Sequence, residues 1–267
     1  MKSVKTYTLI FGLAIILFGC QDVIEINLDS IEPRLVIDGS ITDIDTTLVV
    51  KLTKSGDYFD PETYPNVSGS TVTITDDLGY VSQLLETAPG IYSVNRTGEE
   101  GRSYTMKVES EGEIYNATVE VPYKVAIDSV SFEPTPAYME FSGGYIINCH
   151  LHDPANIENY YRLKVYNIDD PAGASQSLKL FDDAFTDGHD VVLQWDVEQF
   201  IPLNRVVVEL QTLDKSTYDY YFALSSLFEG GMIGNANPSN PITNISNGAL
   251  GYFGAYTVSR DTVLIFP

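Results

Sequence analysis

The sequence predicts a mainly β protein: two antiparallel β-sandwich domains in series, with one short helix in the second, after a cleaved lipoprotein signal peptide. Three observations predict this organisation. Short runs of alternating apolar and polar residues recur along the chain, with turn-forming residues about every 8–12 positions, as in a sandwich. The chain has 18 Tyr and 12 Phe, which favour strands, and only 15 Lys and Arg. Residues 1–20 are organised as an export signal.

The N-terminal segment resembles the signal of a bacterial lipoprotein. Lys2 and Lys5 precede an apolar run, Leu9 to Phe18, that is shorter than the roughly 20 residues a membrane-spanning helix needs. Leu17-Phe18-Gly19-Cys20 then has the form of a lipobox. Because of this motif we expect removal of residues 1–19 and acylation of Cys20. Two or more acyl chains would then give stable attachment to a membrane. The alternative is an ordinary signal peptide with a chance cysteine.

Residues 20–32 are expected to be the lipidated cysteine and a tether. Asp22 lies directly after Cys20, and acidic residues at that place are a sorting signal in some bacteria. We therefore expect an outer-membrane protein held by its lipid, with the cell surface favoured over the periplasmic face.

Residues 33–124 are predicted to form the first sandwich, of the immunoglobulin-like or carboxypeptidase-regulatory kind. A polar loop between Lys54 and Asn66 interrupts its strands, and Asp76-Asp77-Leu78-Gly79 and Pro89-Gly90 read as turns. The predicted strands are Leu35 to Gly39, Leu48 to Thr53, Val67 to Thr75, Ile91-Tyr92, Tyr104 to Val108 and Tyr115 to Val121.

Residues 125–267 are predicted to form the second sandwich-like domain, since Pro122-Tyr123-Lys124 breaks the pattern. Its one helix should begin at a cap, Asp214 or Ser216, and end at Gly230-Gly231, with its aromatic face packed on the sheet. The predicted strands are Ile127 to Phe132, Gly144 to Leu151, Tyr160 to Ile168, Ser177 to Asp182, Val191 to Trp195, Arg205 to Leu213 and Thr262 to Phe266.

Charge excludes one class of partner. The formal net charge is −22, and removal of Lys2 and Lys5 with the leader would make the mature chain more negative still. Nucleic-acid binding through phosphates needs a basic face, so we expect none. Anionic lipid surfaces should repel the body. Soluble cations or a basic partner fit better, although solubility alone explains such a surface.

Cysteine usage leaves one thiol. If Cys20 is acylated, Cys149 remains alone and no intramolecular disulfide can form. Cys149 follows the apolar run Tyr145 to Asn148, so we expect a buried, inert side chain.

The candidate metal ligands are His150 and His152. On a strand, residues two apart point to one side, so both imidazoles could face one ion. Asp153 and His189 are the nearest candidates for a third ligand, and exposed histidines at a strand end are the alternative.

Acidic clusters could supply oxygen ligands for calcium. They are Asp182, Asp183, Asp187 and Asp190, and, in the earlier loop, Asp57, Asp60 and Glu62. None matches the helix–loop–helix calcium pattern, and clusters arise by chance in so acidic a chain.

Loop aromatics are the candidate contacts for a ligand or partner. Tyr58, Phe59 and Tyr64 lie in the polar loop, where they could stack on a sugar or form a protein interface. Tyr252, Phe253 and Tyr256 lie among closely spaced glycines, so we expect them to pack tightly instead.

Several of these segments together resemble a known family. They are the lipobox with Ile24-Glu25-Ile26, Leu35 to Gly39, Gly69 to Asp76, Gly90-Ile91-Tyr92, and the closing Asn244-Ile245-Ser246-Asn247-Gly248 with Gly251-Tyr252-Phe253-Gly254. The chain resembles an uncharacterised outer-membrane lipoprotein family of Bacteroidota type, catalogued as domain of unknown function number four-two-four-nine. Its members are often encoded near TonB-dependent receptors, which implies an accessory role in uptake. The first half also resembles the carboxypeptidase regulatory, transthyretin-like sandwich.

The sequence therefore predicts a lipid-anchored accessory that binds or assembles, without catalysis and without a cofactor. Nucleophile elbows, phosphate loops and zinc-protease motifs are not found in the sequence. A structural or adhesive envelope protein is the first alternative, and a metal-binding protein that uses His150 and His152 is the second.

Overall fold

A computed structural model describes residues 33–56, 64–136, 144–170, 179–233 and 240–266. The leader, Cys20 and the tether lie outside these ranges, as do Tyr58 and Phe59. The described residues are mainly β, with one helix, as the sequence predicts. None of the described helices is both long and apolar enough to span a membrane.

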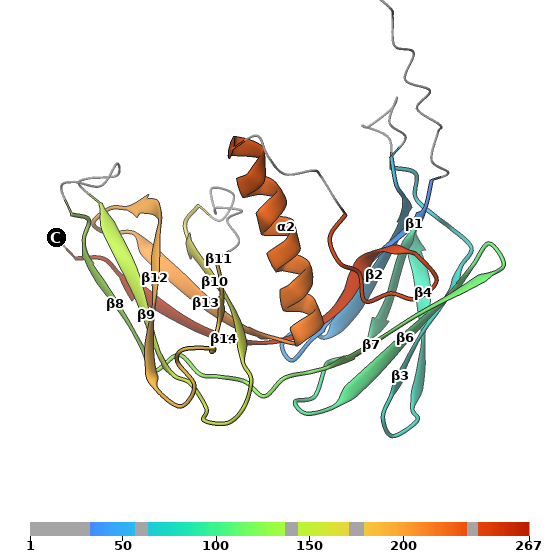
Figure 1. Ribbon diagram of the computed structural model, residues 1–267, viewed down its shortest axis with the longest axis horizontal. Coiled ribbons are helices and arrows are strands. Elements are labelled where there is room, and N and C mark those ends of the chain that lie inside the picture. Colours follow the sequence, from blue (N-terminus) through green and yellow to red (C-terminus); the bar gives the residue numbers. More distant parts are fainter. Residues whose placement is uncertain (1–32, 57–63, 137–143, 171–178, 234–239, 267) are drawn as a thin grey trace, which may run out of the picture. The chain divides into compact units, whose positions relative to one another are not determined.

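Most strands join one mixed sheet (Figure 1). Its order is β11-β10-β13-β14-β1-β2-β5-β4-β3-β6-β7. The strands of this sheet are β1 Leu35–Thr42, β2 Thr47–Lys54, β3 Thr71–Asp76, β4 Val81–Ala88, β5 Ile91–Asn95, β6 Ser103–Ser110, β7 Glu113–Glu120, β10 Tyr160–Asn167, β11 Lys179–Asp182, β13 Arg205–Leu213 and β14 Leu250–Leu264.

A second, three-stranded sheet has the order β12-β9-β8. Its strands are β8 Ser129–Pro134, β9 Tyr145–His152 and β12 Asp190–Phe200. All its pairings are antiparallel. Side chains of β9 and β12 share one hydrophobic core with side chains of β10 and β13, so the two sheets face each other here.

Strand β14 connects the two halves of the large sheet. Its first part pairs in parallel with β1, from Val36 opposite Leu250 to Thr42 opposite Tyr256. The remainder pairs antiparallel with β13, which ends with Arg205 opposite Leu264. Residues 33–267 accordingly form one compact unit.

The hydrophobic core is divided in two. The first cluster contains the inward side chains of β1 to β7, and the second contains those of β9, β10, β12 and β13. Val121 belongs to the first and Val125 to the second. The first cluster also takes four residues from near the C-terminus: Ile245, Ala249, Phe253 and Ala255.

The glycine-rich closing segment is a strand, whereas the sequence predicted a strand only from Thr262. Two features require glycine at position 251. Its φ is +86°, and an added Cβ would lie 2.0 Å from the carbonyl oxygen of Ile37 on β1. Gly254 allows close approach of a side chain, because an added Cβ there would meet the hydroxyl of Thr217 at the start of the helix. The expectation of close backbone approach is thus confirmed.

Helix α2 spans Lys215–Ile233, and Asp214, one of the two predicted caps, lies directly before it. A carboxylate oxygen of Asp214 accepts a hydrogen bond from the backbone N–H of Ser216 at 3.0 Å. Its other oxygen accepts the backbone N–H of Ala255 on β14 at 2.9 Å. The cap therefore also fixes the helix to the sheet. The helix continues past the predicted end at Gly230-Gly231.

The aromatic face of α2 packs on the sheet through Tyr218 and Tyr221, as expected, whereas Phe222 on the same face is 55% exposed. Tyr218 and Tyr160 rings lie 4.7 Å apart, and Tyr220 stacks on Tyr252 at 4.4 Å. Tyr221 and Tyr252 share a hydrogen bond of 2.7 Å. These contacts account for the tight packing predicted around Tyr252.

The Asn244 to Gly248 segment fastens β14 to its surroundings. The Asn244 side chain donates to the carbonyl of Phe253 at 2.6 Å and accepts its N–H at 3.1 Å. Asn247 and Gly248 both have positive φ, and the guanidinium of Arg34 binds the Gly248 carbonyl. Each residue of the motif thus has a definite structural use.

Candidate functional site

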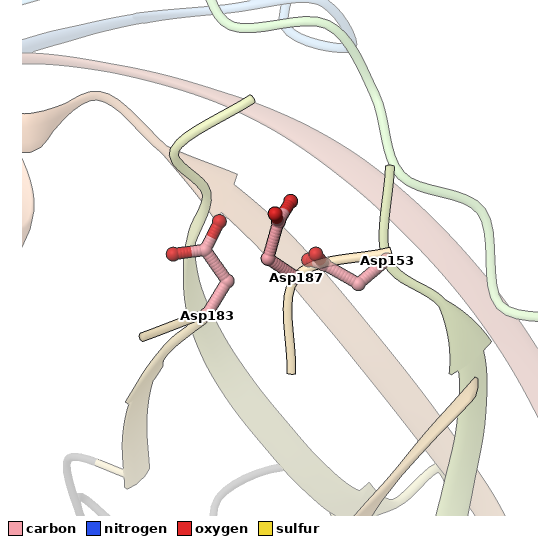
Figure 2. A group of neighbouring side chains, drawn as sticks. All are labelled: Asp153, Asp183 and Asp187. Atoms are coloured by element: carbon pink, nitrogen blue, oxygen red, sulfur yellow. The ribbon is translucent and has the colours of Figure 1, made fainter. Parts of the chain in front are cut away.

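Three carboxylates gather at the end of β9 (Figure 2). Asp153 follows β9, Asp183 follows β11, and Asp187 lies in the turn before β12. One oxygen from each lies within 4.8 Å of the others. Within the described part of the chain, this is the one group of acidic, histidine or cysteine side chains close enough to share a metal ion.

Hydrogen bonds fix all three side chains. The Tyr161 hydroxyl donates to Asp153, and the backbone N–H of Gly188 reaches its second oxygen at 3.3 Å. Backbone N–H groups of Asn159 and Asn156 donate to Asp183 and Asp187, each at 2.7 Å. The carboxylates are therefore positioned by the fold and do not depend on one another for orientation.

Burial makes the group electrostatically costly. Asp153 is fully buried, Asp183 is nearly so, and Asp187 is exposed. Desolvation raises the pKa of Asp183, and the neighbouring charge of Asp153 raises it further, against the lowering effect of its bond from Asn159. Two buried like charges at this distance need a proton or a cation to balance them. Carboxylate oxygens are ligands of hard cations such as calcium.

Asn159 adds a fourth oxygen to this region. It is 5% exposed, and its Oδ1 is buried without a hydrogen-bond partner among the described residues. The backbone N–H of Asp183 donates to the backbone carbonyl of Asn159 at 3.2 Å. Asn159 and Asp183 therefore continue the pairing of Tyr160 with Asp182 by one residue. Residues opposite each other in an antiparallel pair share a face. The Asn159 side chain thus leaves the sheet on the side of Asp183.

The predicted ligands His150 and His152 lie elsewhere on β9. The His150 ring bonds to the Ser131 hydroxyl at 2.7 Å, and His152 bonds to Asp190 at 2.7 Å. The ring of His189 bonds to the carbonyl of Asp187. Neither His150 nor His152 belongs to the group of three carboxylates. A metal held by these two histidines stays a prediction.

Cys149 is buried in the second core, as expected. Burial raises the pKa of its thiol to about 12, and the charges of Asp261 and Asp128 act in the same direction. The thiol is therefore protonated at neutral pH, and only the thiolate is nucleophilic.

The predicted contact residues are only partly within the described ranges. Tyr58 and Phe59 fall outside them, and so does the lipidation candidate Cys20. Tyr64 is described, and its side chain is 60% exposed. Phe253, by contrast, is buried in the first core.

A group of exposed apolar side chains lies on β4 and the turn before it. We call it the β4 patch: Leu78, Tyr80, Val81 and Leu85, between 65% and 69% exposed, with Val49 at 43%. Leu85 and Val49 both lie opposite Ser93 of β5, so they share one face of the sheet. Leu84, the residue before Leu85, points to the opposite face and is buried. One face of β4 thus covers the core, and the other presents apolar groups to solvent.

The sequence does not predict that these three carboxylates lie together. Asp183 and Asp187 were candidate calcium ligands, and Asp153 was considered only beside the histidines. Asn159 and the β4 patch were missed. The patch carried a signal, since Val81 and Leu85 are four residues apart and so on one face of any strand.

Comparison with known proteins gives a family and little else. A family described as "Domain of unknown function (DUF4249)" matches residues 21–262. Among proteins of curated function, none matches this chain. Two solved structures are similar at low level: a two-domain fibronectin type-III segment from chicken tenascin, and "CBD12 from CALX1.2".

These structural similarities are weak. The tenascin segment is 12% identical, with 69% of this chain and 91% of that chain covered and a TM-score of 0.21. The second is 11% identical, with 85% of this chain and 100% of that chain covered and a TM-score of 0.20. Scores of this size carry no argument about fold or function.

Proposed function

Because this chain belongs to the DUF4249 family, whose match covers most of it, we propose that it is an outer-membrane lipoprotein with an accessory role. It binds or assembles and does not catalyse, and it works with a TonB-dependent receptor in nutrient uptake. Its body would consist of two β-sandwich domains in series, residues 33–124 and 125–267, anchored through lipidated Cys20 at the cell surface.

The two hydrophobic cores support the proposed pair of sandwiches. The first core is lined mainly by β1 to β7 and the second by β9, β10, β12 and β13, and β14 passes from one to the other. Two sandwiches on a shared strand would suit a scaffold that holds a partner. It leaves the loops free to vary.

The lipid anchor is supported by sequence. An apolar run followed at once by Leu17-Phe18-Gly19-Cys20 places the cysteine where a leader would be cut. A lipid on Cys20 would confine the body to a membrane surface and raise its effective concentration near a membrane receptor.

The β4 patch is the observation that carries the binding role. Exposed apolar side chains on a strand in the interior of a sheet are an unusual cost for a protein that acts alone, and such patches mark interaction sites. Burial of apolar surface drives most protein association, and aromatic residues such as Tyr80 are enriched among the side chains that contribute most to binding. We propose that the receptor covers Val81 and Leu85.

The test is recovery of a partner from the outer membrane. The tagged, lipidated protein is extracted in mild detergent and purified, and the co-purifying proteins are identified by mass spectrometry. We expect a near-stoichiometric TonB-dependent barrel with the wild type. The double substitution Val81→Thr and Leu85→Thr should reduce its recovery on the order of tenfold, since threonine keeps the strand but removes apolar surface.

A matched control distinguishes the patch from apolar surface in general. Val192 of β12 is 53% exposed in the other sheet. Val192→Thr should leave recovery unchanged. Recovery of the lipoprotein alone from the wild-type membrane would overturn the receptor proposal and favour a structural or adhesive role.

A further inference from the structure

We propose that Asp153, Asp183 and Asp187, together with the side-chain oxygen of Asn159, form a binding site for one calcium ion. This inference does not depend on the accessory role proposed above. It assigns a ligand to a group of side chains that the family match leaves without one.

The site joins segments that are distant along the chain. Asp153 comes from the end of β9, Asn159 from the start of β10, and the other two carboxylates from the turns between β11 and β12. The carboxylate oxygens of the three aspartates lie within 4.8 Å of one another, which matches oxygens around one ion with metal–oxygen distances of about 2.3–2.6 Å. No rearrangement of the backbone is needed to bring them to one cation.

Asn159 gives the independent evidence for a ligand. A buried side-chain oxygen without a partner costs free energy, and such atoms are rare in folded proteins. Its residue lies opposite Asp183, and it is two residues before Tyr161, whose hydroxyl reaches Asp153. The amide oxygen therefore leaves the same face as the carboxylates. A cation among them would satisfy it.

Charge points the same way. Three carboxylates meet here without a described Lys or Arg paired to any of them. Elsewhere in this fold, Arg and Lys neutralise the buried carboxylates of Asp76 and Glu209. The three aspartates differ from these in having no such basic partner among the described residues. A divalent cation would offset two of the three negative charges. It would also relieve the repulsion from Asp153, which adds to the effect of burial in raising the pKa of Asp183.

Ligand chemistry favours calcium over other ions. Calcium accepts several protein oxygens in flexible geometry, whereas magnesium keeps most of its water and usually takes one or two carboxylates. Zinc prefers nitrogen and sulfur, and no imidazole or thiol of the described residues joins the group. An all-oxygen set of three carboxylates and an amide fits calcium best.

The ion would fasten one end of the second core. Leu151, Tyr161 and Phe181 pack in that core, each two residues from a ligand, so the site closes one end of β9, β10 and β11. Loss of the ion should therefore loosen the turns of residues 183–189 first and lower the stability of the whole body.

Calcium titration of the full-length protein tests the proposal. After chelator treatment, isothermal titration should show one calcium per chain with a dissociation constant of roughly 10⁻⁴–10⁻³ M or tighter, and calcium should raise the melting temperature. Terbium in place of calcium should give emission sensitised by Tyr161, and calcium should abolish it by competition.

Two variants locate the site. Asp187→Asn changes an exposed side chain and keeps the oxygen that accepts the Asn156 N–H. Asn159→Ala removes an oxygen with no described partner. Each should weaken calcium binding at least about tenfold without loss of the fold, because each removes charge or one ligand. Asp190→Asn, in the same acidic segment but outside the group, should stay within about twofold of wild type.

The opposing results are equally plain. Absence of calcium binding by the folded wild type would overturn the proposal. So would an equal stabilisation by magnesium and by sodium chloride, since that would be general screening of a chain with a net charge of −22. Equal weakening by Asp190→Asn would do the same.

Discussion

Asp76 is the buried anion that organises the turn between β3 and β4. Its Oδ1 accepts the backbone N–H groups of Leu78 and Tyr80 at 3.0 Å and 2.9 Å. Its Oδ2 pairs with Arg96, and with Arg102 at 3.2 Å. The turn leads directly into the β4 patch, so this carboxylate also positions the proposed binding surface.

The charge on Asp76 should make stability depend on acid. Burial alone would raise the pKa of Asp76, but the bonds from Tyr80, Arg96 and Leu78 hold it below its ordinary value. Because the folded pKa is lowered, the stabilisation is complete above the unfolded value, about 3.9, and is lost as the pH falls through the folded pKa. We expect Asp76→Asn to be less stable than wild type at pH 7, with a gap that narrows below about pH 4. Thermal unfolding across this range measures it, and a gap that stays constant with pH would contradict the explanation.

The metal candidates show what sequence can say about single residues. Residue type and local spacing predict Asp183 and Asp187 as candidate oxygen ligands and place His150 and His152 on one side of a strand. They could not bring Asp153 to Asp183, because that contact depends on how β9, β10 and β11 are arranged. Asn159 has no unusual sequence context, and only its burial without a partner draws attention to it.

At the scale of elements, β14 depends on one glycine. Gly251 has a φ of +86°. The backbone of Ile37 also lies directly against it, where β14 and β1 pair in parallel. The glycine permits both the conformation and the close approach.

The substitution Gly251→Ala should separate these two effects. Gly79 has nearly the same φ, +85°, but open space around it. We expect Gly79→Ala to lower the free energy of unfolding by about 1–2 kcal/mol, from the positive φ alone. Gly251→Ala should cost roughly 3 kcal/mol or more, because the methyl group also displaces β1. Chemical denaturation measures both, and equal costs would show that close approach does not matter.

Most elements could be predicted, and the exceptions have physical reasons. Alternating patterns predict nearly all strands, and spacings of three and four residues with a cap predict the helix, since most of these elements cover a core with one face. Strand β4 was missed because Val81 and Leu85, its exposed residues, are as apolar as its buried Leu84, so the alternation is lost. The start of β14 was missed because glycines usually interrupt strands, and here they serve contacts with β1 and α2.

At the scale of the whole molecule, the two cores share a sheet. Strand β14 pairs with β1 on one side and β13 on the other, so melting of either half would leave an unpaired strand edge. Sequence could not reveal this, because the parallel pairing joins segments more than two hundred residues apart.

The two halves should therefore unfold together. Trp195, the only tryptophan, is buried in the second core, whereas Gly251 lies where β14 pairs with the first. We expect Gly251→Ala to shift the midpoint of Trp195 fluorescence as far as that of far-ultraviolet circular dichroism. A fluorescence midpoint that stays at the wild-type value, while circular dichroism shifts, would mean that the halves unfold independently.

We propose that the β4 patch contacts a TonB-dependent barrel at the outer membrane, and crosslinking in intact cells probes that contact at single residues. A photoreactive amino acid replaces Leu85 in one strain and Val192 in another, and the crosslinked products are identified by mass spectrometry. We expect a barrel receptor crosslinked at position 85 and none at position 192. A lipoprotein that crosslinks to no barrel at position 85, or equally at both positions, would contradict it.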